Sequence, residues 1–533
     1  MTSTSAVEDA DPLVALARRP WPLSLRDEGG THRFTRFCFL RGLGFVYAVA
    51  FYSLVRQMPG LIESQGLLPA APFLSRVRDA LGAAAYVRLP TLFWLGCSDS
   101  VMRYAAWAGV ALSLGVLAGY ANSVMLAALW VLYLSFVNVG QIFYGYGWEL
   151  LLLEAGFLAI FFAPAWEVRP WAASPPPRAV VWLLRWVLFR VMLGAGLIKL
   201  RGDPCWVHLT CLVDHYETQP NPGPLSYYFH AMPLAFHRGG ALFNHFVELV
   251  VPWGYFGTRR IRHAAGAFTI VFQVILILSG NLSFLNWLTI VVALGCFDDS
   301  ALERFFPSRL RARVREIAAR ATGTPSGRGS EASPRVRRRV IVGLVVLVLA
   351  LSVAPTVNLL SPSQTMNASF FPLPIVNTYG AFGSVEHERH EVVLDGTRDD
   401  VLSGDARWQE YEFPCKPGDP RRMPCLVTPY HYRLDWQMWF AGLSNYEHQP
   451  WIVKLVYELL RENPRVTSLL AKDPFKGTPP RYVRALLYRY RFSRERQGGR
   501  WWERELLGEY LRPLSLDDPT LREFLERRGW FDQ

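Results

Sequence analysis

Three charged residues interrupt apolar stretches of this sequence, and they are the first candidates for chemistry. Glu154, Arg190 and Glu248 each lie within a run of residues apolar enough to enter a membrane. An ionisable group inside a membrane span is costly, so it indicates a functional role or a buried partner. At about 1.5 Å of rise per residue, each group falls roughly 10 Å below the same membrane surface. We therefore expect one buried cluster in which the charges compensate one another.

Lys199 follows directly above this cluster, at the outer end of its apolar stretch. Two interpretations stay open: an ion-pair network that holds helices together, or a pocket that opens to the outer side of the membrane. A catalytic pocket needs a side chain that takes up a proton from the reacting group. The candidates for that role are Lys199, Asp203, Glu154 and Glu248.

The loop 199–238 is the polar segment with the densest functional chemistry in the chain. It contains the runs RGDPCW and DHYETQP, and the residues around it add further polar and aromatic groups. We interpret this set as lining a pocket or as facing a protein client. Its members are Arg190, Lys199, Arg201, Asp203, Trp206, His215, Tyr216, Glu217, His245 and Glu248.

The histidines of this loop do not have the spacing of a metal site. His208, His215, His230 and His237 follow one another irregularly, and no H-E-x-x-H pattern occurs. Zinc sites usually repeat a short fixed spacing between ligands. The sequence also lacks the nucleophile elbow, the phosphate-binding loop and the dinucleotide fingerprint. We therefore expect neither a metal nor a cofactor.

Seven cysteines are too few for a disulfide scaffold, and no C-x-x-C pair occurs. Cys415 and Cys425 flank a Pro/Gly-rich turn in a segment that we expect outside the cytoplasm, where a disulfide persists. We predict that they pair, and two free thiols are the alternative. Cys205 and Cys211 could bond to each other, bond to Cys97, or act as a redox couple. Packing accounts for the remaining two cysteines.

The composition predicts a polytopic membrane protein. Hydrophobic residues make up 51% of the 533 residues and charged residues only 19%, below the roughly 25% typical of soluble domains. A membrane-spanning helix needs about 20 mostly apolar residues. The segment 81–96 is interrupted by Arg88 and Pro90, which favours an interfacial or re-entrant position. Nine stretches are candidate spans: 37–56, 103–120, 122–139, 147–164, 179–198, 242–256, 264–279, 283–297 and 339–355.

The arginines indicate the orientation of these spans. The net charge is +12, with five lysines and 51 arginines. Arginines gather in the N-terminal arm 1–36 and in the loops 257–263 and 298–338, which nine spans place on one side. Cytoplasmic loops carry such an excess of positive charge. This explains the basic composition by membrane orientation, so we expect the lipid bilayer as a partner and no nucleic acid.

The segment after residue 355 differs in kind from the helical part. It has turn clusters and short runs of β-forming residues, with helical spacing near 435–443 and 451–461. We predict a mixed, mostly β domain outside the cytoplasm. The expected organisation is a cytoplasmic arm 1–36, a multi-helix membrane domain 37–300, a basic cytoplasmic loop or linker 301–338, a last span 339–355 and a C-terminal domain 356–533.

Several long motifs resemble the lipase maturation factor family. They are GLIKLRGDPCW from residue 196, DHYETQP from 214, NHFVE from 244, SGNLSFLNW from 279, NTYGAFG from 377, CKPGD from 415 and PYHYRLDW from 429. The resemblance extends from the first span nearly to the end. It implies a membrane protein, of the endoplasmic reticulum in animals, that assists folding and assembly of secreted lipases. The implied C-terminal domain lies in the lumen, in agreement with the orientation above.

A shorter resemblance leads to a second hypothesis. The run GLIK that ends at Lys199, followed by Asp203 and Trp206, is similar to the segment around the catalytic lysine of vitamin K-dependent γ-glutamyl carboxylases. By that resemblance Lys199 would be a base. A transporter is a third class, but no inverted repeat and no pair of broken helices is visible in the sequence.

We therefore expect a non-catalytic, membrane-embedded maturation factor, or chaperone, for secreted proteins such as lipases. It would lie in the inner membrane of a bacterium or in the endoplasmic reticulum membrane of a eukaryote. The loop 199–238 and the C-terminal domain would form the surface that meets the client.

Overall fold

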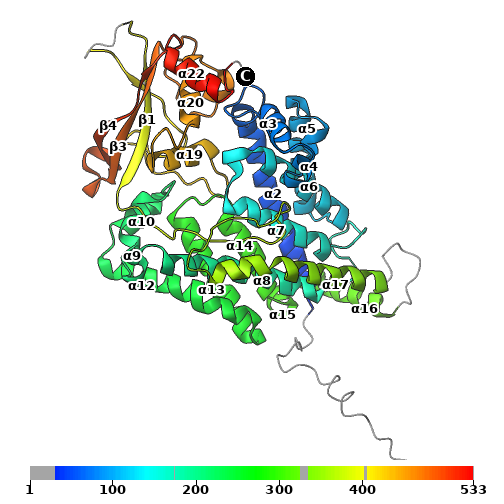
Figure 1. Cartoon of the computed structure of the whole chain (residues 1–533). Coiled ribbons are helices and arrows are strands. Elements are labelled where there is room, and N and C mark those ends of the chain that lie inside the picture. The colour runs from blue at the N-terminus through cyan, green and yellow to red at the C-terminus, as the bar shows by residue number, and fades with distance from the viewer. Residues whose placement is uncertain (1–30, 173, 324–333, 401–404, 532–533) are drawn as a thin grey trace, which may run out of the picture.

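The computed structural model describes residues 31–172, 174–323, 334–400 and 405–531. A helical region up to Leu360 is followed by a region with a four-stranded sheet (Figure 1). This order confirms the architecture expected from the sequence. Residues 1–30 of the expected N-terminal arm, with three of its five arginines, and the middle of the expected linker lie outside the described residues.

Five helices of the described chain are long and apolar enough to cross a membrane. They match five of the nine expected spans, and each begins or ends within a few residues of the prediction. They are α2 (Arg33–Leu61), α5 (Asp99–Ala118), α8 (Arg178–Arg201), α13 (Arg259–Ser279) and the consecutive α17 (Pro334–Leu351) and α18 (Val353–Leu360).

The count of nine spans is not confirmed, because the other four stretches form shorter or broken helices. A bent pair, Leu285–Cys296 and Asp299–Phe305, raises the number to six if it is one span. The remaining helices are shorter than the roughly 20 residues that cross a hydrocarbon core. The short or broken elements are α6 (Ser123–Val139), α7 (Gly147–Phe162), α12 (Leu234–His245), the π-helical η3 (Phe246–Val250), η4 (Val251–Phe256), α14 (Leu285–Ala293), η5 (Leu294–Cys296), α15 (Asp299–Leu302) and η6 (Glu303–Phe305).

Contacts between helix ends show how these elements are oriented. The carboxylate of Asp299 accepts hydrogen bonds from the backbone N–H groups of Arg33 (2.9 Å) and Phe34 (2.7 Å). Arg259 forms an ion pair with the neighbouring Asp298 at 2.9 Å. Helices α2 and α13 therefore begin at the same end of the bundle.

Helices α8 and α17 also begin at that end. Arg33 donates to the carbonyl of Ala172 (2.8 Å), in the segment just before α8. Arg337, in the first turn of α17, donates to the carbonyl of Pro175 (2.6 Å) in the same segment. The C-terminal region lies at the opposite end, where Gln57 of α2 donates to the carbonyl of His431 (2.8 Å).

The segments between the long helices form short elements at the two ends of the bundle. The expected interfacial stretch 81–96 contains only short helical pieces, and Leu95 within it is 90% exposed. The short elements are α3 (Ala70–Leu81), α4 (Ala84–Arg88), η1 (Leu92–Leu95), η2 (Gln141–Tyr144), α9 (Pro204–Val207), α10 (Leu212–Thr218), α11 (Pro224–His230) and α16 (Ser308–Gly323).

The C-terminal region has one antiparallel sheet in the order β2-β1-β3-β4. The alternating residues Val392, Leu394, Val483 and Ala485 are buried in the core, and every residue of α20 is buried too. The region contains more helix than its sequence suggested. Its elements are β1 (Arg389–Thr397), β2 (Gln409–Glu410), α19 (Arg433–Gly442), α20 (Trp451–Leu460), α21 (Pro464–Thr467), β3 (Tyr482–Phe492), η7 (Arg494–Gly499), β4 (Trp502–Leu514) and α22 (Pro519–Arg527).

The two regions share one hydrophobic core. A single cluster of buried side chains runs from Phe39 of α2 through Leu188 of α8 to Leu394 of β1 and Leu455 of α20. Burial of apolar surface is the main favourable term in folding. The C-terminal region is thus packed on the helical region as part of one folded body.

Candidate functional site where the two regions meet

Lys199 is buried and paired rather than free. It lies in the last turn of α8, is 4% exposed, and donates to both carboxylate oxygens of Glu248 at 2.7 Å. Glu248 belongs to the π-helical η3 and also accepts a hydrogen bond from Asn244 (2.8 Å). The lysine does not reach water as an end-of-helix lysine would. A structural ion pair is formed where the carboxylase resemblance requires an available base.

Glu154 and Arg190 form a second buried ion pair, between α7 and α8. The C-terminal region completes it: Glu154 accepts from the hydroxyl of Tyr379 (2.7 Å) and the backbone N–H of Asn377 (3.0 Å). Arg190 in turn donates to the carbonyl of Asn377 (2.6 Å). The motif NTYGAFG therefore contacts the helical region and hydrogen-bonds to both members of the Glu154–Arg190 pair.

The single cluster expected from Glu154, Arg190 and Glu248 is corrected by this geometry. Glu248 pairs with Lys199, and Glu154 pairs with Arg190. Nine residues separate Arg190 from Lys199 on α8, which is about 13 Å along a helix axis. Similar depths for the two acids follow from helix rise alone, but helix rise does not reveal which basic residue each acid meets.

The start of the loop 199–238 is held by the segment that contains Phe382 and Gly383. The backbone N–H of Asp203 donates to the carbonyl of Gly383 (2.8 Å), and the Trp206 indole donates to that of Phe382 (2.8 Å). The Asp203 carboxylate accepts from the N–H of Cys205 (2.9 Å), which caps α9. These residues are brought together as an anchoring surface.

Arg201 and His245 add hydrogen bonds around the start of this loop. Arg201 donates to the carbonyl of Leu359 and to the side chain of Gln364, both at 2.8 Å. His245 donates through Nε2 to the carbonyl of Trp206 (3.0 Å). Both side chains hold backbone in place.

His215, Tyr216 and Glu217 pack into the junction. The ring of His215 meets that of Phe382 edge to face at 4.7 Å, and burial, aided by the charge of Lys199, lowers the pKa of His215 to about 4. Tyr216 packs on Phe229 in the loop. Glu217 accepts from the backbone N–H of Phe492 (2.6 Å), and burial raises its pKa.

Two disulfides lie beside these contacts. Cys205 is bonded to Cys211 and Cys415 to Cys425, while Cys97 is free. Asp203 also lies near the first pair, with the three possible ligand atoms within 4.8 Å. Because both sulfurs are consumed by the disulfide, they provide no thiolate for a metal.

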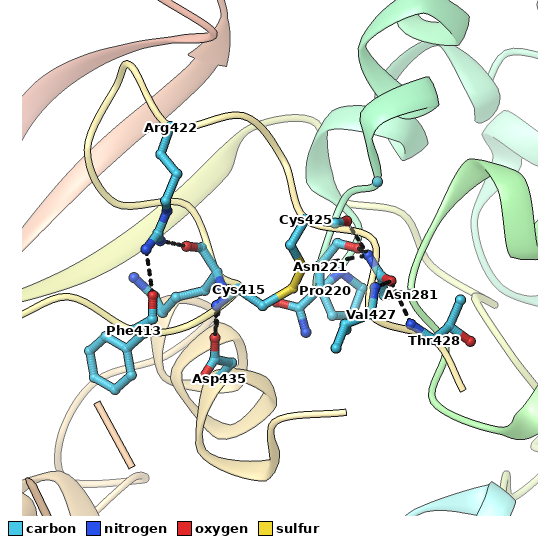
Figure 2. The surroundings of a disulfide bond; sticks show 12 residues. Pro220, Asn221, Asn281, Phe413, Cys415, Arg422, Cys425, Val427, Thr428 and Asp435 are labelled. Carbon is cyan, nitrogen blue, oxygen red and sulfur yellow. Dashed lines mark hydrogen bonds between the residues drawn. A yellow bond between two sulfur atoms is a disulfide. The ribbon is translucent and has the colours of Figure 1, made fainter. Parts of the chain in front are cut away.

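Figure 2 shows the disulfide Cys415–Cys425, which links two segments of the C-terminal region beside their contact with Asn281 of the helical region. On one side the backbone N–H of Cys415 donates to Asp435 (2.6 Å) within the C-terminal region. On the other side Asn281 donates to the carbonyl of Cys425 (2.8 Å) and accepts from the N–H of Val427 (2.8 Å). The disulfide therefore links the segment at Cys415, which is held by Asp435, to the segment at Cys425, which is held by Asn281 of the helical region.

One fully buried ion pair was not anticipated from the sequence. Arg433 pairs with Glu149 at 2.7 Å, and both side chains are 0% exposed. Tyr133 and Trp148 also donate to Glu149, and the guanidinium of Arg433 lies 3.5 Å from the ring centre of Tyr144. The signals were Glu149 within an apolar stretch and Arg433 within PYHYRLDW, but nothing in the sequence joined them.

Arg389 provides a further anchor from β1. It donates to the carbonyls of Glu217 and Pro220, both at 2.9 Å, in the loop 199–238. Its own charge is matched by Glu391, which also pairs with Lys416 at 2.8 Å. The motif DHYETQP is thus bound through its backbone by the sheet.

The chain was compared with known proteins. The family model described as lipase maturation factor transmembrane domain matches residues 34–304, and the model described as lipase maturation factor C-terminal domain matches 375–512. No solved structure matches the chain.

Curated relatives match over nearly the whole length. Lipase maturation factor 1 of Mus musculus is 49% identical over 97% of this chain and 93% of its own length, and that of Homo sapiens is 48% identical over 94% and 91%. Lipase maturation factor 2 of Xenopus laevis is 31% identical over 95% of this chain and 85% of its own length. These matches give no support to the carboxylase resemblance. With long apolar helices and both family domains in one sequence, the chain is a membrane protein that belongs to the lipase maturation factor family.

Proposed function

We propose that this chain is a non-catalytic maturation factor that assists the folding or assembly of secreted proteins, lipases among them. The observation that carries the proposal is the pairing of Lys199 with Glu248 and of Glu154 with Arg190. The charged groups that a catalytic interpretation needs are used to join helices to one another, and the pair of Glu154 and Arg190 also binds the C-terminal region through Asn377. The names of its relatives supply the client class.

The proposed client surface is the exposed part of the loop 199–238 with the adjoining C-terminal region. Lys199, Arg201 and Asp203 of the loop are anchored, whereas a run of apolar side chains in α11, in α12 and in the turn between them is exposed. Its large members are Tyr228, Met232, Leu234 and Phe236. Exposed apolar patches often mark protein-interaction sites. An incompletely folded client exposes apolar segments that fit such a patch.

The proposed topology keeps nine crossings. Helices α2 and α13 begin at one end of the bundle, so an odd number of crossings must lie between them. The long helices α5 and α8 supply only two, which requires the broken element α12–η4 to cross as well. The same reasoning between α13 and α17 requires α14–η5 to cross. The hairpin of α6 and α7 then brings the number from seven to nine.

The proposed orientation places the N-terminus and the basic loop in the cytoplasm and the C-terminal region outside it. The compartment outside would be the lumen of the endoplasmic reticulum in a eukaryote or the periplasm in a bacterium. A reporter active only in the cytoplasm should work when fused at residue 320 and be silent when fused after residue 370. The reverse pattern would contradict the orientation.

The functional test uses cells that lack their own lipase maturation factor. Expressing this chain together with a secreted lipase should restore lipase activity per unit of secreted lipase. Replacing Met232, Leu234 and Phe236 together by serine should abolish that gain while the membrane protein accumulates normally. Val87→Ser and Leu95→Ser, which remove exposed apolar side chains from the stretch 81–96, are the matched controls.

A wild-type chain that accumulates in the membrane without restoring any of the lipases tested would refute the proposal. Equal activity of the triple serine variant would refute the client surface alone. Loss of activity in the controls as well would show a general effect of removing apolar side chains and would likewise count against that surface.

A further inference from the structure

The helix α16 lies along the end of the bundle that is remote from the sheet (Figure 1). Its residues Leu310 and Val314 turn towards a small core that includes Phe34, Leu302 and Phe306. Four-residue spacing places such side chains on one face of a helix. One side of α16 is thus fixed to the helical region, so its other faces have defined positions.

A flank of the helix, about 100° around the axis from Leu310 and Val314, carries exposed arginines. The helix contains five arginines and a single acid. Arg309 and Arg313, one turn apart, are both exposed, and neither has an ion pair with any residue that the structure describes. The neighbouring Arg315 is paired with Glu303 at 2.9 Å. The exposed pair therefore offers positive charge that the described part of the chain does not neutralise.

Exposed aromatic side chains lie at the same end of the bundle. Phe305, directly before α16, is 72% exposed and stands 5.0 Å from the guanidinium of Arg304. Trp166 is 59% exposed and belongs to the loop before α8, at the same end of the bundle. Aromatic rings concentrate at the level of lipid headgroups, with basic residues on the aqueous side. The combination indicates the depth at which α16 meets the bilayer.

We propose that α16 and Phe305 form a surface that binds the headgroups of anionic phospholipids. The two arginines supply charge and hydrogen-bond donors that fit a phosphate. Phe305 enters the adjoining acyl region, as the apolar residues of interfacial helices do. The fixed apolar side of α16 holds these groups in place before lipid arrives. The inference is independent of the client and goes beyond the proposed maturation function.

The test uses the full chain purified in detergent and native mass spectrometry with added lipid. Phosphatidylglycerol and phosphatidylcholine with the same acyl chains are titrated separately, and bound lipid is counted per protein. The test variant is Arg309→Gln with Arg313→Gln. Arg309→Lys with Arg313→Lys retains the charge. Arg76→Gln with Arg78→Gln removes the same charge from the exposed side of α3.

Wild-type protein should bind phosphatidylglycerol more tightly than phosphatidylcholine. The glutamine variant of α16 should bind phosphatidylglycerol roughly 30-fold more weakly, from the usual contribution of two basic residues near an anionic surface. The lysine variant should retain most of the preference, and the α3 variant all of it. Size-exclusion elution identical to wild type shows that the variants are folded.

Three results would overturn the proposal. Unchanged phosphatidylglycerol binding in the α16 glutamine variant would remove the site. An equal loss in the α3 variant would make the effect one of net charge. Loss of the preference in millimolar inorganic phosphate would show a site for free anions instead of lipid.

Discussion

Charged side chains are used differently where the helical bundle meets the C-terminal region and on α16 at the other end of the bundle. At the end that meets the C-terminal region, Lys199, Glu154 and Arg433 each have a buried partner of opposite charge. At the other end, Arg309 and Arg313 are exposed on α16. A buried ion pair is weak evidence for added stability, but removing one partner is strongly destabilising. The paired charges at the first end therefore fix how elements of the protein pack together. The exposed arginines of α16 are available to a partner outside the protein.

The largest expected effect is at Arg433. Changing Arg433 to Met leaves Glu149 buried without its partner, which should lower the free energy of unfolding by about 3–5 kcal/mol. The expected result is a large loss of folded protein, measured by fluorescence-detected size exclusion in detergent. The matched double variant, Glu149→Leu with Arg433→Met, should recover much of the loss. A fully stable Arg433→Met protein would contradict the view that this pair holds the regions together.

A somewhat smaller effect is expected at Lys199, where the pair with Glu248 is 5% exposed. Lys199→Ala should destabilise the protein by roughly 3 kcal/mol, because the carboxylate stays buried. Lys199→Met combined with Glu248→Gln should restore both abundance and client maturation. The measurement is client activity per unit of folded membrane protein. A double variant that accumulates normally yet supports no maturation would favour a chemical role for Lys199.

The disulfides should contribute less than the ion pairs. Closing the ten-residue separation of Cys415 and Cys425 corresponds to about 2.7 kcal/mol, and the six-residue separation of Cys205 and Cys211 to about 2.2 kcal/mol. Serine pairs at the two positions should therefore lower the melting temperature, the first slightly more than the second. Mass spectrometry of unreduced peptides checks the pairing, and free thiols at both Cys415 and Cys425 in native protein would refute it.

The smallest effect concerns acid. The folded-state pKa of His215 is lowered to about 4 by burial, against about 6.5 in an unfolded chain. The folded state therefore binds fewer protons, and the stability present above pH 6.5 is lost as the pH falls towards 4. Between pH 7 and pH 5 the loss should be about 2 kcal/mol.

Thermal unfolding measured across this pH range checks the prediction. His215→Gln cannot take up the proton, so its melting temperature should fall less on acidification than that of the wild type. His387→Gln is the matched control, because this exposed histidine pairs with Asp214 and has a raised pKa. Parallel curves for wild type and His215→Gln would show that other groups govern the acid response.

Helices were predicted correctly where a long apolar stretch is enough to form a membrane-spanning helix. The stretches around α2, α8 and α13 were located from hydrophobicity, because a helix satisfies its own backbone and needs only apolar side chains in lipid. The stretch 242–256 failed as a single helix. Its sequence is apolar enough, but Pro252 cannot donate a helical hydrogen bond, and the structure changes there from π-helix to 3₁₀-helix.

The amino-acid sequence by itself determined that this is a membrane protein with a distinct C-terminal region, and it identified the charged residues within apolar stretches. Hydrophobicity and long motifs are properties of consecutive residues, so a single amino-acid sequence contains them. Only the tertiary structure decided that Glu248 meets Lys199 and that Glu149 meets Arg433, 284 positions away. An ion pair depends on the distance between two atoms in space, and sequence separation does not give that distance. Glu149 and Arg433 join the two regions, and Lys199 and Glu248 join two helices, in agreement with the ion-pair network that the sequence favoured over a pocket.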